Sequence, residues 1–337
     1  MSNYDLSMDY ARYPTLAPLP EELLGSFARC EQCGGADFRF RLPEWTAVCK
    51  TCNRVLPLPT HTPAKPIPTV PRKALCPIQI CSSLEHTVLL RPDGTVRASG
   101  TNHYGECSLS DWSDIVSIST VRGKTAGLRR DGTVLLAGKD VDRYHVEDWR
   151  DIREVCMNNL CIAGLRTDGT VQLAGSTYWM TEALDWTQIK QICCVSNKLV
   201  GRRADGTILV AGYHKDALDV GRWNRIQILA PGLRHLLGLR ADGTVLATGD
   251  SDYNRCNIQN WSDIRALSAS YCHSVGLRAD GTVAATGSNQ RGRCDVGRWK
   301  NVSQIWAGCD FTAAMQHDGT ILCTDPNKQQ WISDALA

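Results

Sequence analysis

Two Cys-x-x-Cys pairs are the residues of this sequence best suited to chemistry. Cys30 and Cys33 are followed, after 15 intervening residues, by Cys49 and Cys52. Pairs at this separation predict a tetrahedral site in which four thiolates bind one Zn²⁺, because each pair supplies two sulfurs to the same ion. Protein ligands would fill all four positions, so the predicted zinc is structural. An iron–sulfur centre or a redox-active pair is the alternative.

The residues around these cysteines predict a zinc ribbon at 28–56, preceded by an N-terminal tail at 1–27. The segment FRFRLPEWTAV indicates two short strands around a turn at Pro43. A unit of this size buries little apolar surface, so the metal would supply its folding energy. Five basic residues would allow the ribbon to contact DNA, RNA or a protein, although a solvated surface explains them equally well: Arg29, Arg39, Arg41, Lys50 and Arg54.

A proline-rich segment follows the ribbon. Residues 57–74 contain six prolines, which block regular helix and sheet and favour a stiff, extended spacer. We therefore place a linker at 57–74 and the start of a second domain at residue 75.

The overall composition is that of an ordinary soluble domain. Among 337 residues, 37 Lys and Arg face 35 Asp and Glu, and this balance argues against chain-wide affinity for nucleic acid or anionic lipid. The N-terminus lacks a basic region followed by an apolar run, and no apolar stretch approaches the roughly 18 residues of a membrane helix. We expect a cytoplasmic, monomeric protein with no membrane contact, whose other twelve cysteines are reduced.

The rest of the chain consists of repeats. The tripeptide Asp-Gly-Thr recurs every 37 or 38 residues, and a tryptophan follows each copy; the turn aspartates are Asp93, Asp131, Asp168, Asp205, Asp242, Asp280 and Asp318. The tryptophans are Trp112, Trp149, Trp186, Trp223, Trp261, Trp299 and Trp331.

One repeat shows how the unit should fold. In SISTVRGKTAGLRRDGTVLLAGK (117–139), three apolar strands are separated by small residues and by the Asp-Gly pair. Asp-Gly between two strands predicts a hairpin with a type I′ turn, in which both central residues have positive φ. A variable loop then leads to the Trp-x-x-Ile step at Trp149 and Ile152, which gives three strands and a short fourth one.

Seven such sheets predict an all-β domain, a seven-bladed β-propeller at 75–337. One sheet cannot bury both of its faces, whereas stacking around an axis does so. The first and last units carry no polar caps, so we expect the ring to close, with 75–81 and 329–336 in adjacent strands.

The repeats resemble those of the regulator of chromosome condensation family. The family pattern is visible as ICSSLEHTVLLRPDGTVRASGTNHYGEC in the first unit and as LSASYCHSVGLRADGTVAATGSNQRGRC in the sixth. The 37-residue spacing is most similar to the bacterial branch, which includes β-lactamase inhibitory proteins. Family members are chiefly protein-binding platforms, and the founding member is a nucleotide exchange factor that also contacts chromatin. The even spacing leaves no room for the exchange factor's inserted wedge, and a secreted inhibitor would need a signal peptide.

Positions that repeat in register are interpreted as framework. His86, His235 and His273 share one position in different units, which favours hydrogen bonding over metal binding or catalysis. Cys107, Cys256 and Cys294 are discounted as a metal site for the same reason. Six arginines two positions before the turn aspartates could form an anion-docking ring, although local pairing is the preferred reading: Arg91, Arg129, Arg166, Arg203, Arg240 and Arg278.

The variable loops contain the candidate binding residues. Aromatic residues gather in the loops of the second, third and fourth units, where the family's Asn-x-x-Gly turn is replaced. Exposed aromatics are common anchors of protein interfaces. Tyr144, Tyr178, Trp179 and Tyr213 are therefore predicted to lie exposed on one rim; packing between neighbouring blades is the alternative.

No grouping of residues predicts an enzyme. The sequence lacks a Gly-rich phosphate loop, a GxSxG elbow and an HExxH motif. The leading hypothesis is an intracellular scaffold that binds a protein partner through the rim, with the ribbon as a second docking element. The alternative is a nucleic-acid-associated factor whose ribbon contacts DNA or RNA while the propeller recruits protein.

Overall fold

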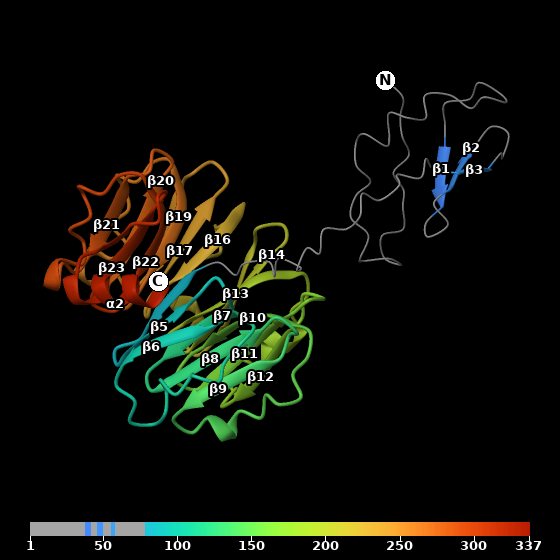
Figure 1. Cartoon of the computed structure of the whole chain (residues 1–337), viewed down its shortest axis with the longest axis horizontal. Helices are drawn as coiled ribbons and strands as arrows, with labels where there is room; N and C mark the ends of the chain where they lie inside the picture. The colour runs from blue at the N-terminus through green and yellow to red at the C-terminus, as the bar shows by residue number, and fades with distance from the viewer. Residues whose placement is uncertain (1–37, 42–45, 50–54, 58–77) are drawn as a thin grey trace. The chain divides into compact units, whose positions relative to one another are not determined.

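The computed structural model describes the backbone of residues 38–41, 46–49 and 55–57, and residues 78–337 in full (Figure 1). The chain divides between Pro71 and Arg72 into two units, which are treated separately. In the first unit β1 (Phe38–Arg41), β2 (Thr46–Cys49) and β3 (Val55–Pro57) form an antiparallel sheet. The first two strands match the predicted hairpin, and the third was not foreseen. Of the predicted zinc ligands, Cys30, Cys33 and Cys52 lie outside the described residues, and only the backbone of Cys49 is described.

Seven three-stranded antiparallel sheets make up the second unit (Figure 1). Each sheet, or blade, consists of three consecutive strands. The first strands are β4 (Gln79–Ser82), β7 (Ile115–Val121), β10 (Ile152–Met157), β13 (Ile189–Val195), β16 (Ile226–Pro231), β19 (Ile264–Ala269) and β22 (Val302–Ala307). The middle strands are β5 (His86–Leu90), β8 (Lys124–Arg129), β11 (Cys161–Arg166), β14 (Lys198–Arg203), β17 (His235–Arg240), β20 (His273–Arg278) and β23 (Thr312–Gln316). The third strands are β6 (Val96–Gly100), β9 (Val134–Gly138), β12 (Val171–Gly175), β15 (Ile208–Gly212), β18 (Val245–Gly249), β21 (Val283–Gly287) and β24 (Ile321–Cys323).

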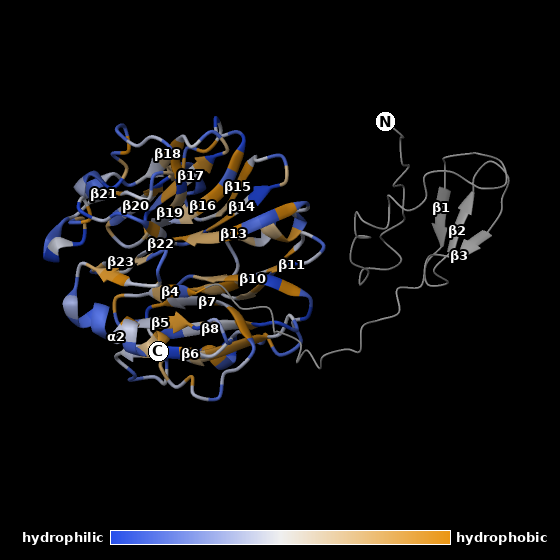
Figure 2. Ribbon diagram, turned by 45° about the horizontal axis from the view of Figure 1, so that its top comes forward, coloured by the Kyte–Doolittle hydropathy of each residue, from blue (hydrophilic) through white to orange (hydrophobic). Residues whose placement is uncertain are grey.

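The blades close into a ring. The first strand of each blade contacts the first strand of the next, and β22 contacts β4, which confirms the predicted closure. Side chains link these strands: Gln79 Oε1 accepts the N–H of Ile118 at 3.1 Å, and Gln191 Oε1 accepts that of Leu229 at 2.9 Å. Buried apolar side chains of neighbouring sheets pack together in core clusters. Figure 2 shows the hydrophobic residues in orange along the strands.

The closing seam differs from the prediction. Residues Pro326–Leu336 form helix α2, where a strand was expected. Asp325 caps the helix by accepting the N–H groups of Asn327 and Lys328, and Pro326 stands in the first turn, where its missing N–H costs no hydrogen bond. Ile332 of the helix packs with Ile80 of β4 and Trp306 of β22 in one core cluster, so side chains complete the ring. Trp306 is thus core, as predicted.

The expected short fourth strand is absent from the blades of residues 78–337. The chain instead passes from one blade to the next through turns and 3₁₀ segments: η1 (Val141–Arg143), η2 (Thr181–Asp185), η3 (Lys215–Ala217), η4 (Asp252–Asn254) and η5 (Gln290–Gly292). Within residues 78–337 and the three N-terminal strands, no helix is long and apolar enough to cross a bilayer.

The Asp-Gly hairpins also differ from the predicted type I′ geometry. In blade two the N–H of Gly132 bonds the carbonyl of Arg129 at 3.0 Å, and of the Asp-Gly pair only the glycine has positive φ (+82°). This is a type I turn followed by a glycine bulge. Asp131 stabilises the turn because its Oδ1 accepts both the N–H and the hydroxyl of Thr133. The same bonds keep the pKa of the Asp131 carboxyl below its ordinary value.

Each framework tryptophan from Trp112 to Trp261 packs on a glycine in the middle strand of the next blade. The ring of Trp186 lies so close to Gly201 that a Cβ there would approach Cζ3 to 2.7 Å. The same approach recurs for the pairs Trp112–Gly127, Trp149–Gly164, Trp223–Gly238 and Trp261–Gly276. Glycine is thus required at these positions because the indole occupies the space of a side chain.

Candidate protein-binding rim

Three of the four predicted aromatic residues lie together on the rim. Tyr178 and Trp179 precede η2 in blade three, and Tyr213 precedes η3 in blade four. Their exposed fractions are 77%, 55% and 48%. The ring of Trp179 lies 4.9 Å from that of Tyr178 and 5.3 Å from that of Tyr213, between ring centroids. Tyr213 in turn contacts the ring of His214, at 3.9 Å. We call Tyr178, Trp179 and Tyr213 the aromatic rim.

Buried residues in the same loops hold the aromatic rim outward. Met180 and Ala183 belong to the core cluster between blades three and four and are 1% and 0% exposed. Leu218, which follows η3, is also buried. Because these three side chains fix the loops from beneath, the adjacent aromatic residues face solvent. Their exposure is therefore built into the loop conformation.

An ion pair joins the two loops. Lys215 Nζ lies 2.8 Å from Glu182 Oε2, and both side chains are nearly half exposed. The hydrogen bond to Glu182 raises the pKa of Lys215. An exposed pair of this kind contributes little to stability, so it orients the loops more than it stabilises the fold.

The prediction for Tyr144 was wrong. This residue is only 6% exposed and belongs to the core cluster between blades two and three. Its ring lies against Gly175, where a Cβ would come within 2.4 Å of Cε1. Gly175 therefore leaves the space that the Tyr144 ring fills, and the packing alternative holds for this one residue.

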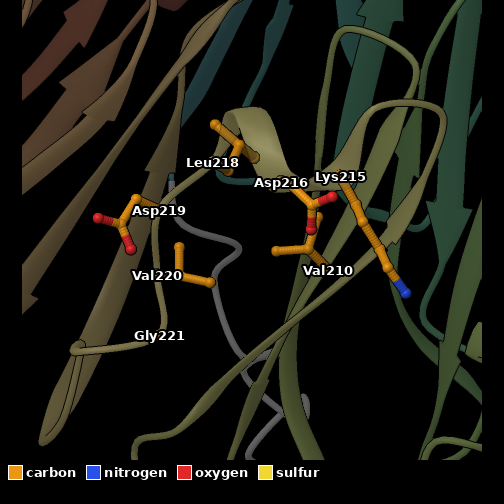
Figure 3. A pocket seen from close by; sticks show the side chains of 7 residues that line it. All are labelled: Val210, Lys215, Asp216, Leu218, Asp219, Val220 and Gly221. Atoms are coloured by element: carbon orange, nitrogen blue, oxygen red, sulfur yellow. The ribbon is translucent and has the colours of Figure 1, made fainter.

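An open pocket lies on blade four and is lined in part by the loop that follows Tyr213 (Figure 3). Its volume is about 390 Å³, and β15, η3 and the chain after η3 supply its walls. The lining residues are Val210, Lys215, Asp216, Leu218, Asp219, Val220 and Gly221. In Figure 3 the carboxylate of Asp216 lies beside Val210, and the amine of Lys215 points away from Asp219. The pocket was not predicted, although the sequence YHKDALDV had marked this loop as a departure from the repeat.

The repeated histidines serve as links between blades. His86 Nε2 lies 2.8 Å from Thr125 Oγ1 of the next blade, and that hydroxyl donates to the carbonyl of Glu106. Since a hydroxyl has one proton, Nε2 of His86 must be the donor in the first bond. His235 and His273 make the same bonds to Ser274 and Thr312, at 2.8 Å each. The structural interpretation of these histidines is thus confirmed.

His235 differs from the other two at Nδ1. In blades one and six this atom bonds a serine three residues earlier, Ser83 or Ser270. Blade five has Gly232 at that place, and Nδ1 of His235 has no hydrogen-bond partner among residues 78–337. Burial, with a contribution from Arg255, lowers the pKa of His235 to about 4. Burial and Arg293 lower that of His273 to about 3.

The other repeated residues show no ligand site. Three of the six repeated arginines donate hydrogen bonds to nearby oxygens. The acceptors are the carbonyl of Ala335 for Arg91, the side-chain oxygen of Gln172 for Arg166 and the carbonyl of Asn224 for Arg240. Within residues 78–337 and the three N-terminal strands, no group of three His, Cys, Asp or Glu side chains could hold a metal ion.

Comparison with known proteins identifies the repeat. Residues 264–293, which contain the three strands of blade six and η5, match the model of the regulator of chromosome condensation (RCC1) repeat. A search of curated protein sequences gave no match.

Several solved structures share the fold. The ectodomain of the Arabidopsis thaliana receptor kinase ACR4 is 16% identical, with a TM-score of 0.57, over 74% of this chain and 94% of that one. Prp20p from Saccharomyces cerevisiae is 14% identical, with a TM-score of 0.56, over 77% and 85% of the two chains. Yeast RCC1 (Prp20), in the structure with Kap60 bound, is also 14% identical, with a TM-score of 0.56. The match covers 77% of this chain and 83% of that one. Together with the seven sheets, these similarities show that residues 78–337 have the seven-bladed propeller fold, in which residues 264–293 match a repeat of the regulator of chromosome condensation family.

Proposed function

We propose that this protein is a scaffold that binds a protein partner through the aromatic rim. The observation that carries the proposal is the contact of Tyr178, Trp179 and Tyr213 across two blades while all three remain largely exposed. Aromatic side chains in such clusters bury a large area on binding and lose little conformational entropy, so they are typical interface anchors.

The structural neighbours support a binding role. One structure of Prp20p is described with its binding to Gsp1p and histones, and another holds Kap60. These partners belong to the yeast protein, and the low identity transfers only the fold. We propose no catalytic role, because the rim and its pocket bring no nucleophile and base together.

Replacing Trp179 with alanine tests the rim. We expect binding of a partner isolated with the full chain to weaken by about 2 kcal/mol or more, a rise in Kd of about 30-fold, because the indole is the central ring of the cluster. The free energy of unfolding should change by less than about 0.5 kcal/mol, since an exposed loop residue loses little packing. Calorimetric titration and urea unfolding of the same preparations measure the two effects.

Tyr253→Ala is the matched control. Tyr253 is 62% exposed in the equivalent loop of blade five, outside the aromatic rim. Its removal should leave Kd unchanged. Equal loss of binding in both variants, or unfolding of the Trp179 variant, would contradict the proposed site.

We further propose that residues 28–56 are a zinc ribbon that gives a second docking element. The support is the spacing of Cys30, Cys33, Cys49 and Cys52 together with the β1–β2 hairpin between the two pairs. Mass spectrometry of the native protein should find one Zn²⁺ per chain. Removal of that ion by a chelator should abolish the ribbon's fold and leave the propeller's unfolding transition in place, because the metal supplies folding energy only locally. Loss of both transitions together would place the two units in one cooperative domain.

The alternative function, contact of the ribbon with DNA or RNA, rests on its five basic residues. Affinity capture from native lysate with and without nuclease distinguishes it. Partners that persist after nuclease treatment support the protein scaffold, and loss of all partners supports the nucleic-acid role.

A further inference from the structure

We propose that the pocket on blade four and the aromatic rim together bind a basic, extended protein segment, and that the pocket receives one of its lysine or arginine side chains. This inference rests on the proposed function and adds the chemistry of the partner. It joins two observations, a pocket with a mixed lining and an excess of acidic groups around the aromatic cluster.

The pocket suits the stem of a long side chain. Val210, Leu218 and Val220 form its apolar walls, and its volume of about 390 Å³ leaves room for one such side chain with water. Lysine and arginine bury their methylene stems against apolar surface while the charged group stays near water and carboxylates. A wholly apolar side chain would instead leave the acidic groups of the pocket without partners.

Two carboxylates of the pocket are available to a cation. The side chains of Asp216 and Asp219 make no hydrogen bond or ion pair with other groups of residues 78–337, and both residues are exposed. The pocket's own cation, Lys215, is held by Glu182 at 2.8 Å. The amine of Lys215 is hydrogen bonded to Glu182 and has only a weaker coulombic interaction with Asp216, so an incoming guanidinium or ammonium group finds carboxylate oxygens without a hydrogen-bond donor.

The surrounding loops carry the same sign of charge. Segments 176–186 and 213–223 contain Glu182, Asp185, Asp216 and Asp219 against Lys215 and Arg222, a net charge of −2. A basic segment is attracted by this excess, and an acidic one is repelled.

The aromatic rim gives the segment a second contact. It shares a loop with the pocket, since Tyr213 contacts Trp179 and lies two residues before Lys215 of the pocket in the chain. Exposed aromatic faces attract cations and also pack against extended backbone. A segment that places one basic residue in the pocket would therefore lay its neighbouring residues on Tyr213 and Trp179.

Selection from random 12-residue peptides displayed on phage tests the inference on the full chain. Wild type and Trp179→Ala are used as parallel targets, and peptides that depend on Trp179 are synthesised. We expect lysine or arginine at one position in most of them. Replacing that residue by glutamine should raise Kd about tenfold, and added NaCl should weaken the parent peptide more than the glutamine one.

The pocket is tested by the double variant Asp216→Asn, Asp219→Asn. Kd for the selected basic peptides should rise about tenfold, with little change for their glutamine versions. The control is Asp140→Asn, Asp142→Asn, which removes two exposed carboxylates from the equivalent loop of blade two and should leave Kd unchanged.

The outcomes separate the two proposals. Trp179-dependent peptides without a basic residue, or basic peptides indifferent to both aspartates, would overturn the basic-segment inference and leave the aromatic rim as a docking surface. If no selected peptide depends on Trp179, the rim itself is not the binding site, and the proposed function fails with the inference.

Discussion

Trp186→Ala should destabilise the propeller by about 3–5 kcal/mol, the usual cost of removing a buried tryptophan. Trp186 is 7% exposed and belongs to the cluster that joins blades three and four. Its ring covers Gly201, which has no side chain to fill the space that the variant would leave. The midpoint of urea unfolding, followed by circular dichroism, measures the loss, and Trp179→Ala is the comparison that should scarcely move it.

A double-mutant cycle tests the cause. Gly201→Ala alone should cost about 1–3 kcal/mol, because its Cβ would meet the indole. In the Trp186→Ala background the same change should cost much less, since the indole is gone. Additive effects would show that the ring and the glycine do not act as a pair. Blade seven offers a natural precedent, since Ala314 stands at the equivalent place and Trp299 is only partly buried.

Acid should weaken the propeller through His235 and His273 as the pH falls from about 6.5 toward about 4. Burial lowers the pKa of these histidines to about 4 and about 3, so the folded state keeps them neutral where the unfolded chain binds protons. The contribution of such a group to the free energy of unfolding is complete above its pKa in the unfolded chain, and it declines as the pH falls below that value. At pH 5 each histidine should have lost about 2 kcal/mol relative to pH 7. Urea midpoints across this range measure the slope, which should be shallower in His273→Gln.

Glu154 opposes this trend and gives the matched variant. Burial raises its pKa to about 7, although its Oε2 accepts the N–H of Ile192 at 2.9 Å. The folded state therefore retains a proton that the unfolded chain has released, and stability from this group increases as pH falls from 7 toward 4.5. Glu154→Gln should remove the compensation and make the acid loss steeper. A slope unchanged by both variants would contradict the assignment.

The repeated features of the fold were predictable because they are local. Asp-Gly-Thr sets each hairpin through bonds within five residues, and the spacing of the tryptophans marks each passage between blades. The predicted type I′ turn was wrong. In blade two the carboxylate of Asp131 accepts the N–H of Thr133, and of the Asp-Gly pair only the glycine has positive φ. Helix α2 has a signal in the sequence, Asp325 followed by Pro326. A strand was expected there because the seventh tryptophan continues the spacing of the repeats.

The rim was predictable only in part because exposure depends on the neighbouring blade. Tyr144 and Tyr178 occupy the same class of loop, yet one is buried and the other exposed. The difference arises from Gly175, which lies 31 residues from Tyr144 and leaves space for its ring. The acidic pocket combines β15 with the chain after η3, and the packing of these two elements cannot be deduced from residue spacing. The ion pair between Glu182 and Lys215 likewise joins residues 33 apart.

The seam between blade seven and blade one bears on where the chain could begin. Each blade is one uninterrupted stretch of chain, and the seam is made by side chains of β4, β22 and α2 together with the bond from Arg91 to the carbonyl of Ala335. No sheet within residues 79–323 combines strands from the two ends. A circular permutant that joined residue 337 to residue 78 through a short peptide and opened in another variable loop would therefore keep all seven sheets intact. Since each sheet within residues 79–323 is formed by three consecutive strands, any of the seven blades could come first in such a permutant.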